Sequence, residues 1–302
     1  MEDPLQIGIA GTGRMGAAIA ARLLDRGHSV TVWNRSPGKT KPLADAGATV
    51  APTPQALSTA ADCIITMLTD AAAIEATYQG QSGLLAGSVR GKLFIDMSTV
   101  RPEVETALAA KVKEKGAALI ECPVGGTVGP AKEGKLFGFV GGDAGDVARA
   151  RPVLDELCRR VEHVGAVGAG ASMKLAINLP LLVYYQALGE ALSLCRGLDI
   201  APARLIDIFA DTSGGPNMLK VRGSAIAATL QGKETNPVTF DVELIRKDLR
   251  TMLEEAAGLG VSLPLTARAL DCYDAVAADG LGASDATMLP AHWLRKGGRE
   301  VP

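Results

Sequence analysis

The 302-residue sequence carries 31 basic and 33 acidic side chains, so its net charge of −2 provides no basic surplus for binding nucleic acid. It is 47% hydrophobic but only 4% aromatic, which indicates a sizeable core packed mainly from aliphatic side chains. This length favours about two domains. The longest apolar run, 179–188, is too short to span a bilayer, and the N-terminus lacks a signal-peptide pattern. We therefore expect a cytoplasmic protein that binds neither membranes nor nucleic acid.

The cysteines and histidines form no recognisable metal-binding or disulfide pattern. The five cysteines are scattered, with no CxxC pair and no histidine cluster nearby: Cys63, Cys122, Cys158, Cys195 and Cys272. We predict free thiols in a reducing compartment and no metal site.

Strand and helix signals alternate through the first half of the chain. Short apolar runs predict strands, and two stretches with helical periodicity lie between them. The strands are expected at 6–11, 29–34, 62–68, 92–99 and 118–124, and the helices at 17–27 and 102–116. Strands that alternate with helices predict a parallel sheet with right-handed crossovers.

The pattern changes after a glycine-rich segment. Residues 125–142 contain seven glycines and predict a loop followed by a strand at the rim of the sheet, before a helix at 146–160. Beyond this point the periodicity predicts mainly helices, at 171–196, 202–210, 216–229, 241–258 and 264–278. The fold class is therefore α/β, with two domains. A Rossmann-type, doubly wound domain is expected at 1–167, followed at 168–302 by an all-α domain built on a long interdomain helix.

A glycine pattern near the N-terminus predicts a dinucleotide site. Gly11, Gly13 and Gly16 form G-x-G-x-x-G between the first strand and the first helix. The first glycine permits a tight turn, the second lets the backbone approach a pyrophosphate, and the third lets the helix pack on the strand. The intervening Thr12, Arg14 and Met15 are predicted cofactor contacts. The alternative is a glycine-rich turn with no ligand.

The end of the second predicted strand favours NADP(H) over NAD(H). An acidic residue usually holds the ribose 2′-hydroxyl of NAD at this point. Here the sequence has Asn34, Arg35 and Ser36, with Lys39 nearby. A guanidinium can pair with a 2′-phosphate, which a carboxylate would repel. Alternatively, Arg35 and Lys39 belong to an ordinary solvated turn.

Two further strand ends are expected at the crevice where ligands bind in open α/β sheets. The predicted cofactor contacts there are Met67, Leu68, Thr69, Ser98 and Thr99. The hydroxyls of Ser98 and Thr99 could bind near the nicotinamide, and Ser98 is also a candidate substrate contact. The alternative is that either hydroxyl caps the helix that begins near Pro102.

Lys174 and Asn178 interrupt an otherwise apolar helix, four residues apart and therefore on one face. From periodicity alone, the lysine could extend its ammonium to solvent while the amide makes a structural contact. If instead the start of the second domain faces the nicotinamide, the lysine can act as a general acid.

These motifs together resemble the β-hydroxyacid dehydrogenase family, which includes 3-hydroxyisobutyrate dehydrogenases and tartronate, glyoxylate and succinic semialdehyde reductases. The resemblance covers essentially the whole chain. The motifs are "GIAGTGRMG", "ECPVGGTVGPAKEG", "GAGASMKLAIN", "FDVELIRKDL", "LPLTARAL" and "DGLGASD".

The resemblance implies roles for particular residues. It makes Lys174 the general acid/base, Asn178 its neighbour in the substrate site and Lys247 the lysine that closes over the cofactor. It also implies that the segment Gly125, Gly126 and Thr127 binds substrate, and that the chain forms a homodimer or homotetramer through its helical domain.

The substrate loop departs from the family pattern. The family usually has Ser-Gly-Gly after Pro-Val, whereas this chain has Gly125, Gly126 and Thr127. The backbone amides can still bind an anion, and relatives that act on sulfonated aldehydes carry Pro-Val-Gly-x-Thr. The acid group of the substrate therefore stays open. Glu121 replaces a commoner Asp, which we interpret as structural.

The resulting hypothesis is an NADP-dependent oxidoreductase that interconverts a small acidic aldehyde or keto acid with its hydroxy acid. One alternative is an imine reductase on the same scaffold, although such relatives typically replace the lysine found here as Lys174. A second is a non-enzymatic NADP-binding protein that assembles partners. A phosphogluconate dehydrogenase would be a longer chain with a histidine beside the Lys–Asn pair.

Overall fold

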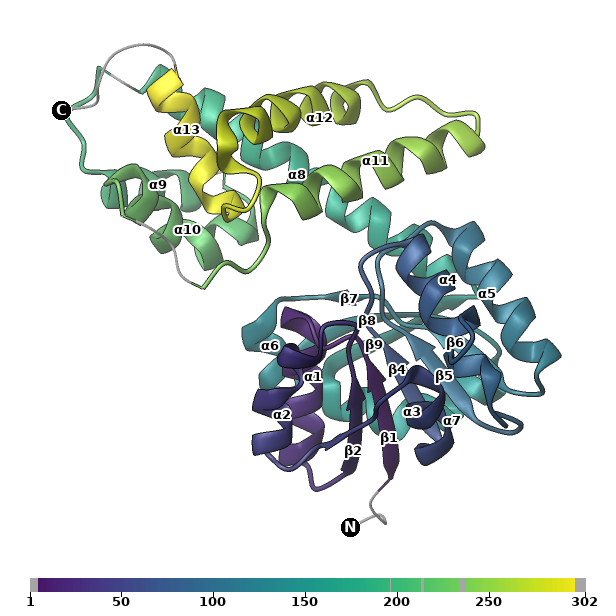
Figure 1. Cartoon of the computed structure of the whole chain (residues 1–302). Helices are drawn as coiled ribbons and strands as arrows, with labels where there is room; N and C mark the ends of the chain where they lie inside the picture. Colours follow the sequence, from purple (N-terminus) through teal and green to yellow (C-terminus); the bar gives the residue numbers. More distant parts are fainter. Residues whose placement is uncertain (1–4, 196, 213–214, 234–236, 297–302) are drawn as a thin grey trace. The chain divides into compact units, whose positions relative to one another are not determined.

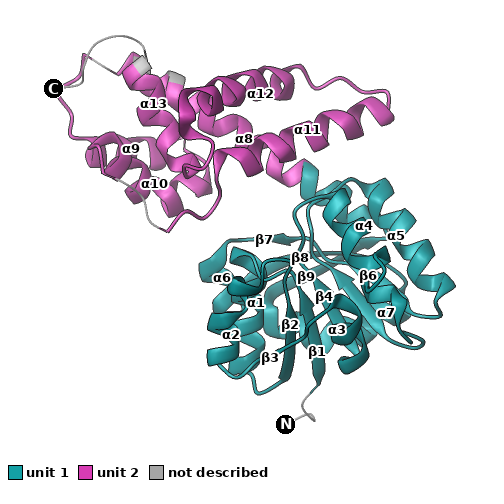
Figure 2. Cartoon of the chain, in the orientation of Figure 1, with its two compact units in different colours: residues 1–175 teal, residues 176–302 magenta. Residues whose placement is uncertain are grey.

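The computed structural model describes residues 5–195, 197–212, 215–233 and 237–296 (Figure 1). The chain divides into two compact units, residues 1–175 and 176–302 (Figure 2). The division falls inside the long helix α8, Ala169–Leu194, whereas the sequence placed the domain boundary just before it, at 167. The first turns of α8 count with the first unit because Gly168, Gly170 and Ala171 are hydrogen-bonded to the side chain of Glu121.

Unit 1 is built on a sheet whose strands run in the order β3-β2-β1-β4-β5-β6-β8-β7, with β9 paired to β8. The strands from β3 to β6 are parallel, as predicted. Their carboxyl ends therefore lie at one edge of the sheet. The bounds are β1 Gln6–Ala10, β2 Ser29–Trp33, β3 Thr49–Val50, β4 Cys63–Thr66, β5 Leu93–Asp96, β6 Ala118–Glu121, β7 Val124–Gly125, β8 Leu136–Gly141 and β9 Cys158–Gly165.

Helices cover both faces of this sheet, so the doubly wound prediction is confirmed (Figure 1). One apolar cluster packs α1 and α7 against one face, and a second packs α3, α4 and α5 against the other. The helices are α1 Arg14–Asp25, α2 Lys41–Asp45, α3 Pro54–Ala60, α4 Ala71–Gln79, α5 Pro102–Glu114, α6 Val128–Lys132 and α7 Ala144–Leu157, with short 3-10 turns at Pro37–Lys39 and Leu84–Ala86.

The last part of the sheet differs from the sequence prediction. Strand β8 is antiparallel to β6 and β7. For β7 the reason is that the segment 126–135 that joins it to β8 is too short for a parallel crossover, which needs a dozen or more residues. The predicted helix 146–160 is wrong at its end, since α7 stops at Leu157 and β9 follows at once. Residues 158–165 do not alternate strictly, because two pairs of polar residues, Arg159–Arg160 and Glu162–His163, separate the apolar ones, so the sequence gives only a weak strand signal here.

Unit 2 is helical, as predicted. The helix α9, Pro202–Ala210, has the predicted bounds, and the last residue of the predicted helix 171–196 lies outside the described residues. Helix α9 packs against α10, and α11 packs against α12. The other bounds are α10 Asn217–Leu230, α11 Val242–Gly258, α12 Pro264–Val276 and α13 Leu289–Lys296, with a π turn at Ala277–Leu281 and a 3-10 turn at Ala286–Met288.

The buried carboxylate of Asp285 joins the segment before α11 to the segment before α13. Its Oδ2 accepts hydrogen bonds from the backbone N–H groups of Thr239 (2.7 Å) and Phe240 (3.2 Å) and from the Thr239 hydroxyl (2.9 Å). Its Oδ1 accepts from the N–H (3.1 Å) and hydroxyl (2.9 Å) of Thr287. Burial alone would raise the pKa of Asp285, but these hydrogen bonds lower it below its usual value.

Candidate active site

The three glycines of the N-terminal motif occupy positions with three different requirements. Gly11 has a φ of +99°, and a Cβ there would collide with the Met67 carbonyl oxygen. A Cβ at Gly16 would collide with the Gly11 carbonyl oxygen, so α1 can lie close to β1 only without one. A Cβ at Gly13 would have no protein atom within 4 Å. The space beside Gly13 at the start of α1 is therefore open to a ligand, which fits a pyrophosphate.

A cavity of about 410 Å³ adjoins this loop at the carboxyl ends of the parallel strands. It brings together nine of the predicted cofactor residues: Gly11, Gly13, Asn34, Arg35, Ser36, Lys39, Met67, Leu68 and Thr69. The rest of the lining was not predicted from the sequence. Trp33 is the last residue of β2, and the others come from α3, α4 and the turn after α4: Pro54, Ala73, Ala76, Thr77, Gly80, Ser82 and Gly83. The cavity therefore includes the turn after β2 at which the sequence predicted the adenosine ribose.

The side chain of Asn34 connects the glycine loop to the basic turn. Its Oδ1 accepts a hydrogen bond from the Thr12 N–H (3.0 Å), and its Nδ2 donates to the Ser36 carbonyl (3.0 Å). Asn34 therefore has a bracing role that the sequence did not reveal. Arg35, Ser36 and Lys39 are exposed on the cavity rim, where their side chains can meet a charged ligand.

Ser98 is hydrogen-bonded to the segment that follows β4. It is buried, its hydroxyl accepts a hydrogen bond from the Leu68 N–H (3.0 Å), and its own N–H donates to Asp96 Oδ1 (2.8 Å). The alternative that Ser98 or Thr99 caps the following helix is wrong, because the N-cap residue of α5 is Arg101.

The loop 125–127 begins at the short strand β7. Gly125 pairs with Phe137 of β8, and a Cβ at Gly125 would lie at ordinary contact distance, 3.7 Å, from Phe137 and Phe139. Gly126 has a φ of +125°, and a Cβ there would lie 2.8 Å from Leu136 Cδ2. Thr127 is the N-cap residue of α6, but its hydroxyl does not bond to the helix. A side chain thus fits at 125 but not at 126.

Lys174 lies in the second turn of α8, within unit 1, and is buried with 9% of its surface exposed. The start of this helix is held by Glu121 at the end of β6. The Oε1 atom of Glu121 accepts from the N–H groups of Gly168 (2.5 Å) and Gly170 (2.8 Å), and Oε2 accepts from Ala171 (3.2 Å). The turn that carries Lys174 is therefore fixed to the sheet by a carboxylate, which agrees with a structural role for Glu121.

Asn178 follows Lys174 by one helical turn and is also buried. In unit 2 its Nδ2 donates a long hydrogen bond (3.4 Å) to Oδ2 of the buried Asp248, whose Oδ1 lies 2.7 Å from Lys247 Nζ. The sequence indicated Lys247 through the family resemblance but missed Asp248. The only sequence signal for Asp248 is its position directly after the implicated Lys247.

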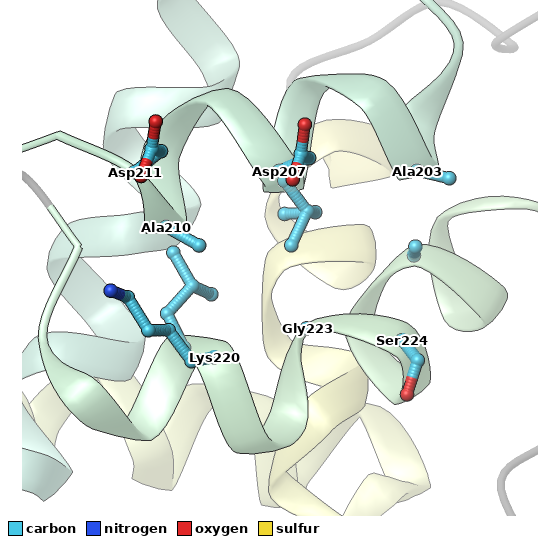
Figure 3. A pocket seen from close by; sticks show the side chains of 10 residues that line it. Ala203, Asp207, Ala210, Asp211, Lys220, Gly223 and Ser224 are labelled. Atoms are coloured by element: carbon cyan, nitrogen blue, oxygen red, sulfur yellow. The ribbon is translucent and has the colours of Figure 1, made fainter.

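A second hollow, of about 410 Å³, lies between α9 and α10 in unit 2 (Figure 3). Its walls include Asp207, Asp211, Lys220 and Ser224, with alanine and aliphatic side chains between them. None of the predicted catalytic, substrate or cofactor residues lines it. The hollow therefore does not compete with unit 1 as the candidate active site.

Comparison with known proteins supplies independent information. Residues 6–165 match the family model for the NAD-binding domain of 6-phosphogluconate dehydrogenase. Residues 168–292 match the model for the NAD-binding segment of NADP-dependent 3-hydroxyisobutyrate dehydrogenase. A 3-hydroxyisobutyrate dehydrogenase from Pseudomonas aeruginosa is 35% identical over 269 residues, which cover 88% of this chain and 90% of that protein. The chain belongs to the β-hydroxyacid dehydrogenase family.

Two further comparisons show how much of the chain the likeness covers. Glyoxylate/succinic semialdehyde reductase 1 from Arabidopsis thaliana is 31% identical over 281 residues, covering 93% of this chain and 96% of that protein. The solved structure of Psf3 in complex with NADP+ and 2-OPP has a TM-score of 0.83 at 28% identity, covering 97% of this chain and 100% of that one. As a family member, the protein is an NAD(P)-dependent oxidoreductase with a Rossmann domain and a helical C-terminal domain.

The described residues offer no competing type of site. Their His, Cys, Asp and Glu side chains include no group of three that could hold a metal ion. The cysteines are free, and Cys122 and Cys158 are buried. In the same part of the chain, no helix has the length and apolar character needed to cross a membrane.

Proposed function

We propose that this enzyme uses NADP(H) to interconvert a small anionic aldehyde or keto acid with the corresponding hydroxy acid, with Lys174 as the general acid/base. The supporting observation is that unit 1 alone contains the glycine cradle, the loop 125–127 and a buried lysine on a helix start that is anchored to the sheet. The relatives named above support the same substrate class, since they include a 3-hydroxyisobutyrate dehydrogenase and a glyoxylate/succinic semialdehyde reductase.

In this mechanism the bound nicotinamide supplies or accepts the hydride. Lys174 donates a proton from Nζ to the carbonyl oxygen as that oxygen gains negative charge, and it removes the proton in the reverse direction. Because Lys174 is buried, its charge is expected to interact with the developing negative charge more strongly than it would in water. The loop 125–127 binds the acid group of the substrate through backbone N–H groups and the Thr127 hydroxyl.

Asn178 orients the substrate or the ammonium one helical turn from Lys174. Asp248 Oδ2 accepts a hydrogen bond from Asn178 Nδ2. In this proposal Asp248 therefore acts through Asn178 rather than on the substrate. Lys247, which pairs with the other oxygen of Asp248, is proposed to contact the cofactor.

The proposed preference for NADP(H) rests on Arg35. Replacement by Ala is expected to lower kcat/KM for NADPH by roughly tenfold or more, because charge-assisted hydrogen bonds to a 2′-phosphate contribute about 1.5–3 kcal/mol before solvent screening. The kcat/KM for NADH should change little, because NADH has no 2′-phosphate. Steady-state kinetics with both cofactors measures this.

Lys41→Ala is the matched control, since Lys41 is an exposed cation already paired with Asp45 at 2.8 Å. Equal losses with NADPH and NADH in Arg35→Ala would contradict the preference. Asn34 is not substituted in this test, because an aspartate at position 34 would have no N–H group to donate to the Ser36 carbonyl.

Gly125 is proposed to set which acid group the loop accepts. Gly125→Ser should fold normally and cost less than about 0.5 kcal/mol of stability, because its Cβ has room. The added hydroxyl is expected to change KM for a carboxylated aldehyde relative to a sulfonated one by about tenfold, the effect of one hydrogen bond. Gly126→Ser is the control, and its positive φ should make it less stable by about 1–3 kcal/mol. Unchanged relative KM values in Gly125→Ser would show that position 125 does not contact the acid group.

A panel of small aldehydes tests the function itself. We expect NADPH oxidation with semialdehydes that carry a carboxylate or sulfonate, and at least a tenfold lower kcat/KM with uncharged analogues. Equal rates with charged and uncharged members would overturn the anionic substrate. Imines in the same panel test the imine reductase alternative, which the retention of Lys174 disfavours.

The assembly and the compartment are also proposals. Several large apolar side chains of the helical unit are exposed: Leu198, Ile208, Val221, Leu259, Val261 and Leu265. An oligomer that covers some of them agrees with the homodimer or homotetramer implied by the family, and a reducing cytoplasm agrees with the free cysteines. Light scattering measures the oligomeric state.

A further inference from the structure

Three carboxyl groups that the proposed mechanism does not use meet inside unit 1. Asp96 and Glu121 are the last residues of the neighbouring strands β5 and β6 and are paired in register. Glu105 belongs to the first turn of α5. All three are fully buried; the negative charges of Asp96 and Glu121 raise the pKa of Glu105, and that of Asp96 raises the pKa of Glu121.

The three groups differ in their partners. Asp96 accepts hydrogen bonds from the Ser98 N–H and the Thr66 hydroxyl. Glu121 accepts from three N–H groups at the start of α8. Glu105 lies beside Asp96, and burial, followed by the negative charges of Asp96 and Glu121, raises the pKa of Glu105 well above its usual value. Burial and the neighbouring negative charges thus favour the neutral form of Glu105.

The surroundings of Glu121 leave it little freedom to move. A Cβ at Gly141 would collide with Glu121 Oε1, and a Cβ at Gly170 would lie 3.2 Å from the same atom. The carboxylate thus fills the space between β8 and the first turn of α8 and satisfies N–H groups that a helix start leaves without partners. Lys174 follows Ala171, the third of these donors, by less than one turn.

We propose that Glu121 is a positioning residue for Lys174: its carboxyl group accepts hydrogen bonds from three N–H groups at the start of α8 and so fixes that turn to the sheet. This inference rests on the proposed role of Lys174. A shift of about 1 Å in a catalytic group can lower a rate by roughly a hundredfold. A loosened helix start would therefore lower kcat without removing any group that contacts substrate or cofactor.

The direct test compares two substitutions of a buried carboxyl group by an amide. Glu121→Gln turns one acceptor into a donor that faces the N–H groups, and we expect kcat to fall roughly tenfold to a hundredfold. The Kd for NADPH and the KM for the aldehyde should stay within about twofold, since Glu121 contacts neither in this scheme. Glu105→Gln is the matched control, because an amide mimics a neutral carboxyl, and its kcat should equal that of the wild type. Wild-type kcat in Glu121→Gln would overturn the proposal.

Hydrogen exchange provides a readout that does not depend on activity. We expect the amides of residues 168–175 to exchange faster in Glu121→Gln but not in Glu105→Gln. If the wild type turned over no aldehyde, the proposed function would fail, and this measurement would still decide whether Glu121 fixes α8. Should Glu121→Gln not fold, Glu121→Asp carries the same test with a smaller expected loss of kcat. Faster exchange with wild-type kcat would overturn the positioning role.

The pH dependence supplies a second signature. Burial raises the pKa of Glu121 to about 7, against hydrogen bonds that lower it. The titratable groups that face it are Asp96 from β5 and Glu105 from α5, while β8 and the start of α8 present glycines. In the wild type kcat should fall as pH drops through about 7, because Glu121 becomes protonated. In Glu121→Gln this decrease of kcat at acidic pH should be absent.

The stability of the folded protein should depend on pH in the opposite direction from kcat, falling as pH rises. The folded-state pKa of Glu121 lies above its ordinary value of 4.5, so its contribution to stability is complete at acidic pH and is lost as pH rises through about 7. The Tm of the wild type should therefore fall relative to that of Glu121→Gln between about pH 5 and about pH 8. A parallel course of the two Tm curves would show that Glu121 does not titrate in this range and would contradict the ionisable anchor.

Discussion

Lys174→Ala is expected to lower kcat by about 10²–10⁴-fold, the usual cost of removing a positioned proton donor. The Kd for NADPH should stay close to the wild-type value, because the glycine loop and the basic turn that are proposed to bind the cofactor do not include Lys174. Single-turnover kinetics and a fluorescence titration of NADPH measure the two quantities separately.

Two further variants make the Lys174 result specific. Lys174→Met keeps a long apolar side chain and should be as inactive as Lys174→Ala, which separates lost chemistry from lost packing. Lys113→Ala, an exposed lysine on α5, should have wild-type activity. A tenth or more of wild-type kcat in Lys174→Met would show that the ammonium is not the acid/base.

Asp285→Ala is expected to produce the largest loss of stability. It removes a buried acceptor from three N–H groups and two hydroxyls of Thr239, Phe240 and Thr287. Hydrogen bonds to a charged group contribute roughly 1.5–3 kcal/mol each and are not additive, so we expect a loss of at least about 3 kcal/mol. Denaturant unfolding measures this, with the exposed Asp211→Ala as the control.

The pH dependence of this effect has a definite sign. The folded-state pKa of Asp285 is lowered, so its stabilisation is present above the ordinary value of 3.8 and is lost as pH falls below it. The difference between wild type and Asp285→Ala should therefore shrink in acid below about pH 4. A constant difference across that range would show that the carboxylate charge contributes nothing.

The sequence predicts much of the fold because its signals are local. The three glycines of the dinucleotide loop could be assigned separate roles, since each role depends on the adjoining turn, strand and helix. The helix α9 has its predicted bounds because Pro202 marks its start and the apolar periodicity is regular. Strand β9 was missed because the apolar residues of α7 run directly into it without a glycine or proline between them.

The interior of the site was harder to predict because it depends on long-range contacts. Asn34 was assigned to the cofactor, but its amide bridges Thr12 and Ser36, a contact that depends on the pairing of β1 with β2. The meeting of Asp96, Glu105 and Glu121 requires two strands and a helix to come together. Polar residues in such a cluster look like surface residues in a sequence, because pattern analysis cannot show which partners satisfy them.

Transfer of deuterium from labelled NADPH to an acidic semialdehyde tests the central claim most directly. Wild-type enzyme should produce a hydroxy acid that carries one deuterium at the former carbonyl carbon, and Lys174→Ala should produce almost none while still binding NADPH. If the wild type binds NADPH but transfers no deuterium to any carboxylated or sulfonated aldehyde, the protein is not the proposed reductase, and a cofactor-binding assembly protein becomes the better account.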